Sequence, residues 1–144
     1  MDFEELLKLD NQLCFSLYVC SKEIIRKYKA ILEPLKLTYT GYITMLALWE
    51  KDEITVKELG KRLFLDSGTL TPLLKKLEAV GYVQRCRSND DERNVYIRLT
   101  QEGKQLKEKA MEVPQQLICC AHLDMEKCAG LLQDLHLLME DIQE

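Results

Sequence analysis

Hydrophobic and polar positions follow a helical spacing around residues 66–80. Four leucines recur at three- and four-residue steps and form one apolar face: Leu70, Leu73, Leu74 and Leu77. This spacing predicts an amphipathic helix. Asp66 or Ser67 can cap its N-terminus, and Pro72 falls early enough to fit the first two turns. The opposite face carries short hydroxyl side chains and lysines, which suits contact with a polar partner.

The neighbouring patterns extend this helix into a larger motif. Residues 55–63 form a shorter amphipathic helix just before it, and two helices joined in this way make a helix-turn-helix. Gly81 ends the second helix. Residues 82–87 and 94–99 then alternate with a strand period on either side of a polar turn at 88–93. The sequence therefore predicts a β-hairpin wing directly after a recognition helix.

This arrangement predicts contacts with double-stranded DNA. Short hydroxyls reach base edges or phosphates in a major groove, and arginines on a wing bind phosphates or enter a minor groove. The predicted DNA-binding residues are Ser67, Gly68, Thr69, Thr71, Lys75, Arg85, Arg87 and Arg93. In the turn, we expect Asp91 to orient Arg93 through a carboxylate pair.

The two ends of the chain carry apolar stripes that need a partner. One long stripe runs from Phe3 to Leu32, and another follows Asp124 to Ile142. Thr100 can cap a further helix that reaches the middle 110s, with a kink at Pro114. Exposed stripes of this kind indicate burial against a second copy. A symmetric dimer would place two recognition helices ~34 Å apart, on a pseudo-palindromic operator.

Charge is divided unevenly along the chain. The whole sequence of 144 residues has a formal net charge of −4, yet residues 53–109 carry 12 Lys/Arg and 9 Asp/Glu, a net of +3. The basic excess coincides with the helix-turn-helix and wing, so the overall acidity does not exclude a DNA-binding protein. Specificity is then expected to depend on geometry and on a dimeric footprint.

Composition favours a folded protein rather than a disordered or membrane protein. Hydrophobic residues make up 47% and charged residues 31% of the chain. The acidic N-terminus lacks the features of a secretory signal, so we expect a cytoplasmic protein with no membrane partner. The six cysteines are then expected to be reduced thiols.

The predicted fold class is mainly α with a small β-hairpin wing, that is, α+β. We interpret residues 1–144 as a single winged helix-turn-helix domain. Within it, residues 1–36 and 100–144 are predicted dimerisation helices, residues 38–99 the DNA-binding region, residues 66–80 the recognition helix and residues 83–99 the wing.

Several segments together resemble a known family. The helix-turn-helix, the Asp91-Glu92-Arg93 wing and the flanking helices resemble the MarR-type winged-helix repressors over essentially the whole chain. Residues 11–18 (NQLCFSLY), 28–29 (YK), 37–39 (LTY) and 65–72 (LDSGTLTP) further resemble the organic hydroperoxide resistance regulators and their staphylococcal oxidation-sensing relatives.

The resemblance implies a homodimer that represses peroxide-resistance genes while Cys14 is reduced, and that releases its operator once Cys14 is oxidised. It implies that Tyr28 and Tyr39, from the other subunit, hydrogen-bond the Cys14 thiolate, with Tyr18 as a further neighbour. Cys119 and Cys120 are candidate resolving thiols, and a one-cysteine mechanism stays open beside the two-cysteine one. Organic hydroperoxides and low-molecular-weight thiols are the implied redox partners.

The residue types agree with this chemistry. Only a thiolate attacks a peroxide oxygen, and an ordinary cysteine with a pKa of about 8.5 is mostly protonated in the cytosol. Phenolic O–H groups can stabilise the anion without adding charge. The resulting sulfenic acid would form a disulfide or oxidise further. Without the resemblance, the spacing favours Cys14 as a small packing residue on an apolar stripe over a sensing thiol.

The sequence leaves three alternatives to compare. A metal site could draw on the cluster of Cys119, Cys120, His122, Asp124 and Cys128, but adjacent cysteines on a helix point about 100° apart, and no metal or other cofactor is expected. A thiol peroxidase has no use for a helix-turn-helix and wing, so an enzyme is not expected. The remaining alternative is a MarR-type repressor that binds a phenolic or lipophilic effector near Tyr18 and Trp49, with Cys14 structural.

Overall fold

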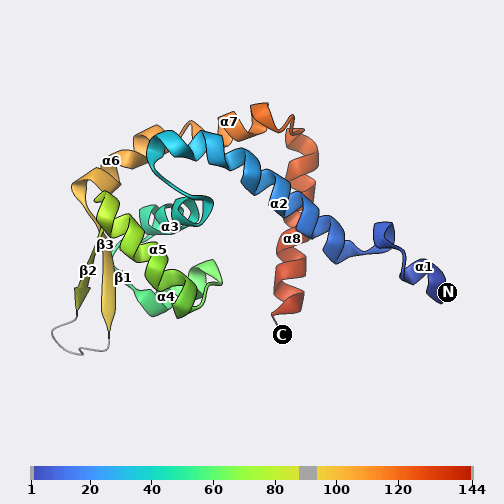
Figure 1. Cartoon of the computed structure of the whole chain (residues 1–144), viewed down its shortest axis with the longest axis horizontal. Coiled ribbons are helices and arrows are strands. Elements are labelled where there is room, and N and C mark those ends of the chain that lie inside the picture. Colours follow the sequence, from blue (N-terminus) through green and yellow to red (C-terminus); the bar gives the residue numbers. More distant parts are fainter. Residues whose placement is uncertain (1, 88–93, 144) are drawn as a thin grey trace. The chain divides into compact units, whose positions relative to one another are not determined.

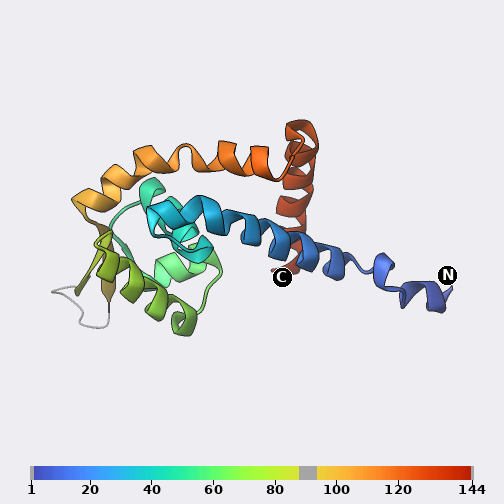
Figure 2. The same cartoon turned by 45° about the horizontal axis from the view of Figure 1, so that its top comes forward.

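The computed structural model describes residues 2–87 and 94–143. The described chain divides into two compact units, one formed by residues 28–113 and one by residues 1–27 with 114–144. Figures 1 and 2 show the elements of each unit from two directions. The predicted fold class is confirmed, because the chain is mainly helical with one small antiparallel sheet.

The unit of residues 28–113 contains the helix-turn-helix and the wing. Its helices are α3 (Tyr39–Glu50), α4 (Val56–Leu63), α5 (Ser67–Val80) and α6 (Gln101–Ala110), preceded by a short 3₁₀ helix, η2 (Glu33–Leu35). The sheet has strand order β1-β3-β2, with β1 (Ile54–Thr55), β2 (Val83–Arg87) and β3 (Val95–Leu99) all antiparallel to their neighbours. β2 is therefore an edge strand.

Local sequence sets the boundaries of these helices. Thr55 accepts a hydrogen bond from the backbone N–H of Glu58, whose side chain in turn accepts from the N–H of Thr55, a complete capping box. Asp66 caps α5 by accepting from Thr69, and Thr100 caps α6 in the same way. Gly81 ends α5 with φ +95°, a conformation that glycine adopts at little cost.

One hydrophobic core holds this unit together. Leu59 of α4 and Leu70, Leu74 and Leu77 of α5 pack with Leu48 of α3 in the same buried cluster. Hydrogen bonds from distant residues reinforce it: the Trp49 indole donates to the Gly103 carbonyl (2.9 Å), and the Tyr82 hydroxyl donates to the Leu35 carbonyl (2.7 Å). The recognition helix is thus fixed by its apolar face, and its polar face remains exposed.

The other unit consists of the terminal helices. It contains α1 (Phe3–Leu6), a 3₁₀ helix, η1 (Leu9–Asn11), α8 (Met125–Ile142), most of α7 (Val113–Cys120) and the first part of α2 (Leu13–Leu32), a helix that continues into the other unit. Among the described residues of this unit, Leu117 is the one buried hydrophobic side chain. An apolar stripe without a covering layer leaves most of its hydrophobic area in water.

Three features differ from the sequence prediction. The N-terminal stripe does not lie on one continuous helix, because the chain leaves helical geometry between α1 and α2. There the Asn11 and Gln12 side chains hydrogen-bond the carbonyls of Glu5 and Lys8, which offers the backbone an alternative to the helix. The helix after the wing ends at Ala110, and Pro114 lies in the first turn of α7 rather than at a kink. Strand β1 was not predicted, since two residues are too few to show a period.

Candidate nucleic-acid interface and thiol site

The recognition helix separates its side chains cleanly into two sets. Leu70, Leu73, Leu74 and Leu77 are buried, at 1–8% exposure. The predicted contact residues on the same helix are all exposed: Ser67, Gly68, Thr69, Thr71 and Lys75. The structure therefore leaves these five predicted residues accessible on α5, outside its buried leucine face.

The N-terminus of α5 is shaped by Asp66. Its carboxylate accepts a hydrogen bond of 2.7 Å from the Thr69 N–H, and this bond lowers the pKa of Asp66 below its ordinary value. Asp66 is consequently ionised at neutral pH and holds the first turn in helical geometry. Ser67 and Thr69 are positioned by that cap.

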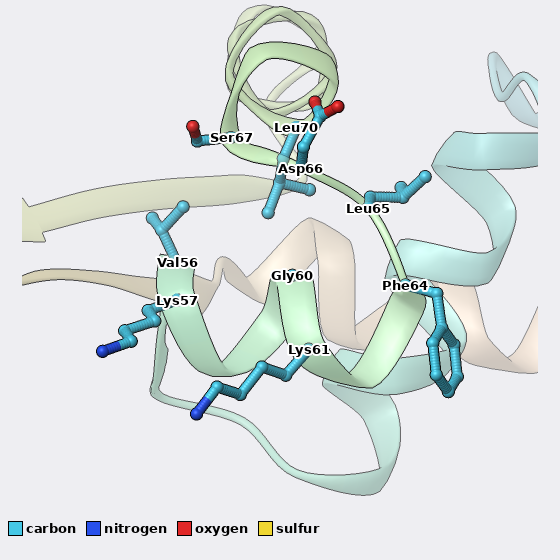
Figure 3. A pocket seen from close by; sticks show the side chains of 9 residues that line it. All are labelled: Val56, Lys57, Gly60, Lys61, Phe64, Leu65, Asp66, Ser67 and Leu70. Carbon is cyan, nitrogen blue, oxygen red and sulfur yellow. The ribbon is translucent and has the colours of Figure 1, made fainter. Parts of the chain in front are cut away.

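A groove of about 740 Å³ lies between α4 and the start of α5. Val56 and Leu70 point into it, and Lys57 and Lys61 extend outward from α4 on the same side (Figure 3). Neither lysine was among the residues predicted from the sequence to contact DNA. Their four-residue spacing on an exposed helix face was the signal that could have identified them.

The turn between α4 and α5 exposes an aromatic ring. Phe64 adopts a left-handed conformation with φ +56° and is 60% exposed. That conformation is uncommon for a bulky residue. It ends α4 two residues before the extended Asp66 that caps α5, so Phe64 serves the geometry of the helix-turn-helix.

Two predicted arginines lie on the edge strand β2, and both are exposed. Arg85 is bound by Glu78 of α5: its backbone N–H donates to Oε2 at 3.0 Å, and its Nη2 donates to Oε1 at 3.3 Å. These bonds lower the pKa of Glu78. Arg87 forms no ion pair within residues 2–87 and 94–143. Arg93 and its predicted partner Asp91 lie outside the described residues.

Cys14, the predicted sensing thiol, lies in the first turn of α2 and is exposed. Tyr18 follows one turn later on the same helix and is also exposed, with the Lys22 ammonium 5.4 Å from its ring centroid. Cys14 and Tyr18 share one helix face because they are four residues apart.

Tyr28 and Tyr39 belong to the unit of residues 28–113, and the structure brings their rings together. Their centroids are 4.9 Å apart, and the Tyr42 ring lies 5.7 Å from that of Tyr28. Burial raises the pKa of Tyr42, and the neighbouring Tyr39 raises it further. This cluster of three phenols was not predicted as a unit; Tyr42 was missed because it lies among apolar residues.

The other candidate thiols lie at the end of α7. Cys119 accepts a weak bond from Gln115 (3.7 Å), Cys120 contacts the Leu117 carbonyl (3.5 Å), and both are exposed. All six cysteines are free. Within the described ranges, no three His, Cys, Asp or Glu side chains gather in a way that could hold a metal ion. Asp124, one of the five residues of the alternative metal site, instead caps α8.

The described residues contain no helix whose length and hydropathy would allow it to span a bilayer. The described residues that were predicted from the sequence thus fall into four groups. These are the exposed face of α5 with β2, Cys14 with Tyr18, Tyr28 with Tyr39, and Cys119 with Cys120 at the end of α7.

Comparison with known proteins gives related regulators. The transcriptional regulator SarA/Rot family matches residues 26–110. The organic hydroperoxide resistance transcriptional regulator of Bacillus subtilis (strain 168) is 44% identical over 138 residues, which cover 96% of this chain and 94% of that protein. The HTH-type transcriptional regulator SarZ of Staphylococcus saprophyticus is 50% identical over 127 residues, covering 88% of this chain and 87% of the relative.

A solved structure is similar over nearly the whole length. The structure of reduced AbfR bound to DNA has a TM-score of 0.82 and 34% sequence identity, and the match covers 99% of this chain and 100% of that one.

Proposed function

Because the chain belongs to the family of organic hydroperoxide resistance and SarZ transcriptional regulators, we propose that it represses peroxide-resistance genes and releases its operator when Cys14 is oxidised. It is a DNA-binding regulator and not an enzyme. It acts in the cytoplasm as a homodimer on a pseudo-palindromic operator. The observation that carries this proposal is the exposed polar face of α5, opposite four buried leucines.

The DNA-binding part of the proposal follows from that face. Ser67, Thr69 and Thr71 contact base edges or phosphates in the major groove, where Gly68 allows close approach and Lys75 contacts phosphate one turn further along. Arg87 and Arg93 of the wing bind the flanking backbone or minor groove. Reduced AbfR, a protein of similar structure, is bound to DNA in its solved structure.

The sensing part rests on Cys14 and on the phenols. The exposed thiol is accessible to a hydroperoxide, and the thiolate attacks the peroxide oxygen, which gives Cys14 sulfenic acid and releases the alcohol. In the dimer, Tyr28 and Tyr39 of one subunit support the thiolate of the other, with Tyr18 beside it on α2. A low-molecular-weight thiol, or Cys119 or Cys120, then condenses with the sulfenic acid to a disulfide and water.

The test compares operator binding by the wild type, Cys14→Ser and Cys20→Ser. The operator is first obtained by selection from random duplexes, and each protein is titrated before and after cumene hydroperoxide and after added reductant. Cys20 is a matched control, because it is an exposed cysteine six residues later on the same helix. We expect reversible release by the wild type and Cys20→Ser and continued binding by Cys14→Ser.

If all three proteins stay bound after peroxide, Cys14 is a structural residue. The function would then be repression controlled by a phenolic or lipophilic effector. Non-reducing electrophoresis of the treated wild type separates the two oxidation modes, since pairing with Cys119 or Cys120 of the other subunit gives a crosslinked dimer.

A further inference from the structure

One carboxylate fastens the wing to the recognition helix. Glu78 lies in the last turn of α5 and accepts three hydrogen bonds from Arg85 of β2: from the backbone N–H at 3.0 Å, from Nη2 at 3.3 Å and from Nε at 3.5 Å. The carboxylate thus binds both the main chain and the side chain of one residue. Bonds to two separate groups fix the orientation of the strand as well as its distance from the helix.

The position of Arg85 in the sheet explains why this matters. β2 is an edge strand, and Arg85 lies opposite Ile97, which is also opposite Ile54 of β1. An outward-facing N–H on an edge strand has no strand partner and is otherwise left to water. Glu78 occupies that position with an ionised acceptor, and hydrogen bonds to a charged group are roughly twice as strong as neutral ones.

The pair also removes a cation from the DNA-facing charge of the wing. The side chains of Arg85 and Glu78 are 33% and 39% exposed, so solvent reaches both. The guanidinium nevertheless lies against a carboxylate rather than facing solvent alone. On the same strand, Arg87 has no ion pair among the described residues, so it remains the free cation of β2 there.

We propose that Glu78 is a positioning residue for operator binding. Through Arg85, it holds the wing at a fixed angle to the recognition helix, so that both can engage one duplex together. Arg85 then acts as a strut, that is, a structural link between β2 and α5, and does not contact phosphate. This role replaces the DNA-contact role predicted for it from the sequence. This inference rests on the proposed DNA-binding function.

The two roles of Arg85 predict opposite results. If the pair is a strut, Glu78→Gln weakens operator binding on the order of tenfold, Arg85→Gln does the same, and the double variant is no weaker than either single one. The dependence of affinity on salt keeps its slope in Arg85→Gln. If Arg85 instead binds phosphate, Arg85→Gln lowers that slope by about one, and Glu78→Gln strengthens binding because it removes a competing anion.

Lys75→Gln is the matched control for the salt measurement. Lys75 is an exposed cation on α5 and a proposed phosphate contact, so its loss should lower the slope by about one. Thermal unfolding of each variant checks that the fold is retained. If the losses of operator affinity in Glu78→Gln and Arg85→Gln add up in the double variant, the pair does not act as a strut and the proposal is wrong.

A measurement without DNA keeps the two proposals separate. Amide hydrogen exchange followed by NMR should show a protected Arg85 N–H in the wild type and faster exchange in Glu78→Gln, with unchanged exchange at Ile97 in the core. Equal exchange at Arg85 in both proteins overturns the strut whatever the DNA result. If the wild type binds no duplex, the proposed function is wrong. If the Arg85 N–H is then still protected in the wild type and exchanges faster in Glu78→Gln, the strut itself is supported.

Discussion

At the scale of single residues, Gly103 fixes how closely α6 approaches the start of the wing. A Cβ at this position would lie 2.1 Å from the Tyr82 carbonyl oxygen, a distance that no real contact allows. The obstacle is backbone, which cannot rotate away as a side chain can. The Gly103 carbonyl also accepts the Trp49 indole bond, so displacement of this residue disturbs two contacts of the core.

We therefore predict that Gly103→Ala lowers the free energy of unfolding by roughly 1–3 kcal/mol, the usual cost of overpacking. Chemical denaturation measures it. Gly130→Ala is the control, because no atom outside its own helix lies within 4 Å of the added Cβ. There the better helix propensity of alanine should give a gain of up to about 1 kcal/mol. Equal stability of Gly103→Ala and the wild type would contradict the close approach.

The buried tyrosines predict a loss of stability at alkaline pH. The pKa of Tyr82 is raised from 10.0, first by burial and then by the nearby Glu102. An acid whose folded-state pKa is raised stabilises the fold fully below its unfolded pKa, and this contribution is lost as pH rises through the folded pKa. We expect the unfolding free energy of the wild type to fall above about pH 10.

Tyr82→Phe isolates this effect. The variant also loses the hydrogen bond to the Leu35 carbonyl, so it should be less stable at neutral pH by about 1 kcal/mol. Above pH 10 its curve should be flatter than that of the wild type, leaving the contribution of Tyr42, which has the same sign. Denaturation curves at several alkaline pH values give the comparison, and parallel curves would refute the assignment to Tyr82.

At the scale of elements, the capping box decides where α4 begins. Thr55 and Glu58 satisfy each other's backbone N–H groups, and Thr55 also pairs with Tyr96 in the sheet. One residue therefore ends a strand and starts the first helix of the helix-turn-helix.

Thr55→Ala should lower the unfolding free energy by about 1 kcal/mol, because the Glu58 N–H loses its acceptor. Thr55→Ser keeps the hydroxyl and should recover most of that loss. Thermal or chemical unfolding of the two variants measures the difference. If alanine and serine were equally destabilising, the hydroxyl cap would not be the cause.

The elements also show what the sequence could predict. Asp66, Gly81, Thr100 and Asp124 gave correct helix boundaries, because a cap is a local interaction between residues close in the chain. The leucines of α5 gave its buried face for the same reason. The break between α1 and α2 was missed because the Asn11 and Gln12 side chains hydrogen-bond backbone carbonyls there in place of a continuous helix. The spacing of apolar residues carries no information about such polar bonds.

Tertiary partners lay beyond the sequence pattern. Arg85 was predicted as a DNA contact from its sign and place on the wing, but its pairing with Glu78 depends on how β2 leaves α5 through Gly81. The three-phenol cluster likewise joins residues of α2 and α3. The exposure of the predicted residues on α5 therefore followed from the sequence pattern, whereas their charge balance and neighbours required the fold.

At the scale of the whole molecule, the terminal helices leave an apolar surface that a single chain does not cover. Leu131 and Leu132 of α8 are 56% and 55% exposed, and Phe3 and Ile142 are 78% and 72% exposed. Isolated exposed leucines are ordinary, but a stripe along a whole helix marks an interaction surface. The proposed homodimer gives this stripe a partner of the same composition.

We predict that Leu132→Glu weakens the dimer by at least about tenfold, because burial of one leucine contributes about 1.5–3 kcal/mol and a carboxylate opposes burial. Sedimentation equilibrium measures the dissociation constant, and Gln133→Glu is the control, since it adds the same charge to the adjacent exposed residue. If the dissociation constant of the dimer is the same in Leu132→Glu and the wild type, the interface lies elsewhere.

The same variant tests the link between dimerisation and operator geometry. Two recognition helices of a symmetric dimer read half-sites about one helical turn apart, so inserting about 5 base pairs between the half-sites turns one of them to the opposite face of the DNA. We expect this insertion to abolish tight binding by the wild type. At concentrations where Leu132→Glu is monomeric, we expect it to bind each half-site weakly and with the same affinity at either spacing, because the gain in affinity from dimerisation requires both half-sites to be bound at once. A wild type that is also indifferent to spacing would show that one recognition helix and its wing suffice for the operator.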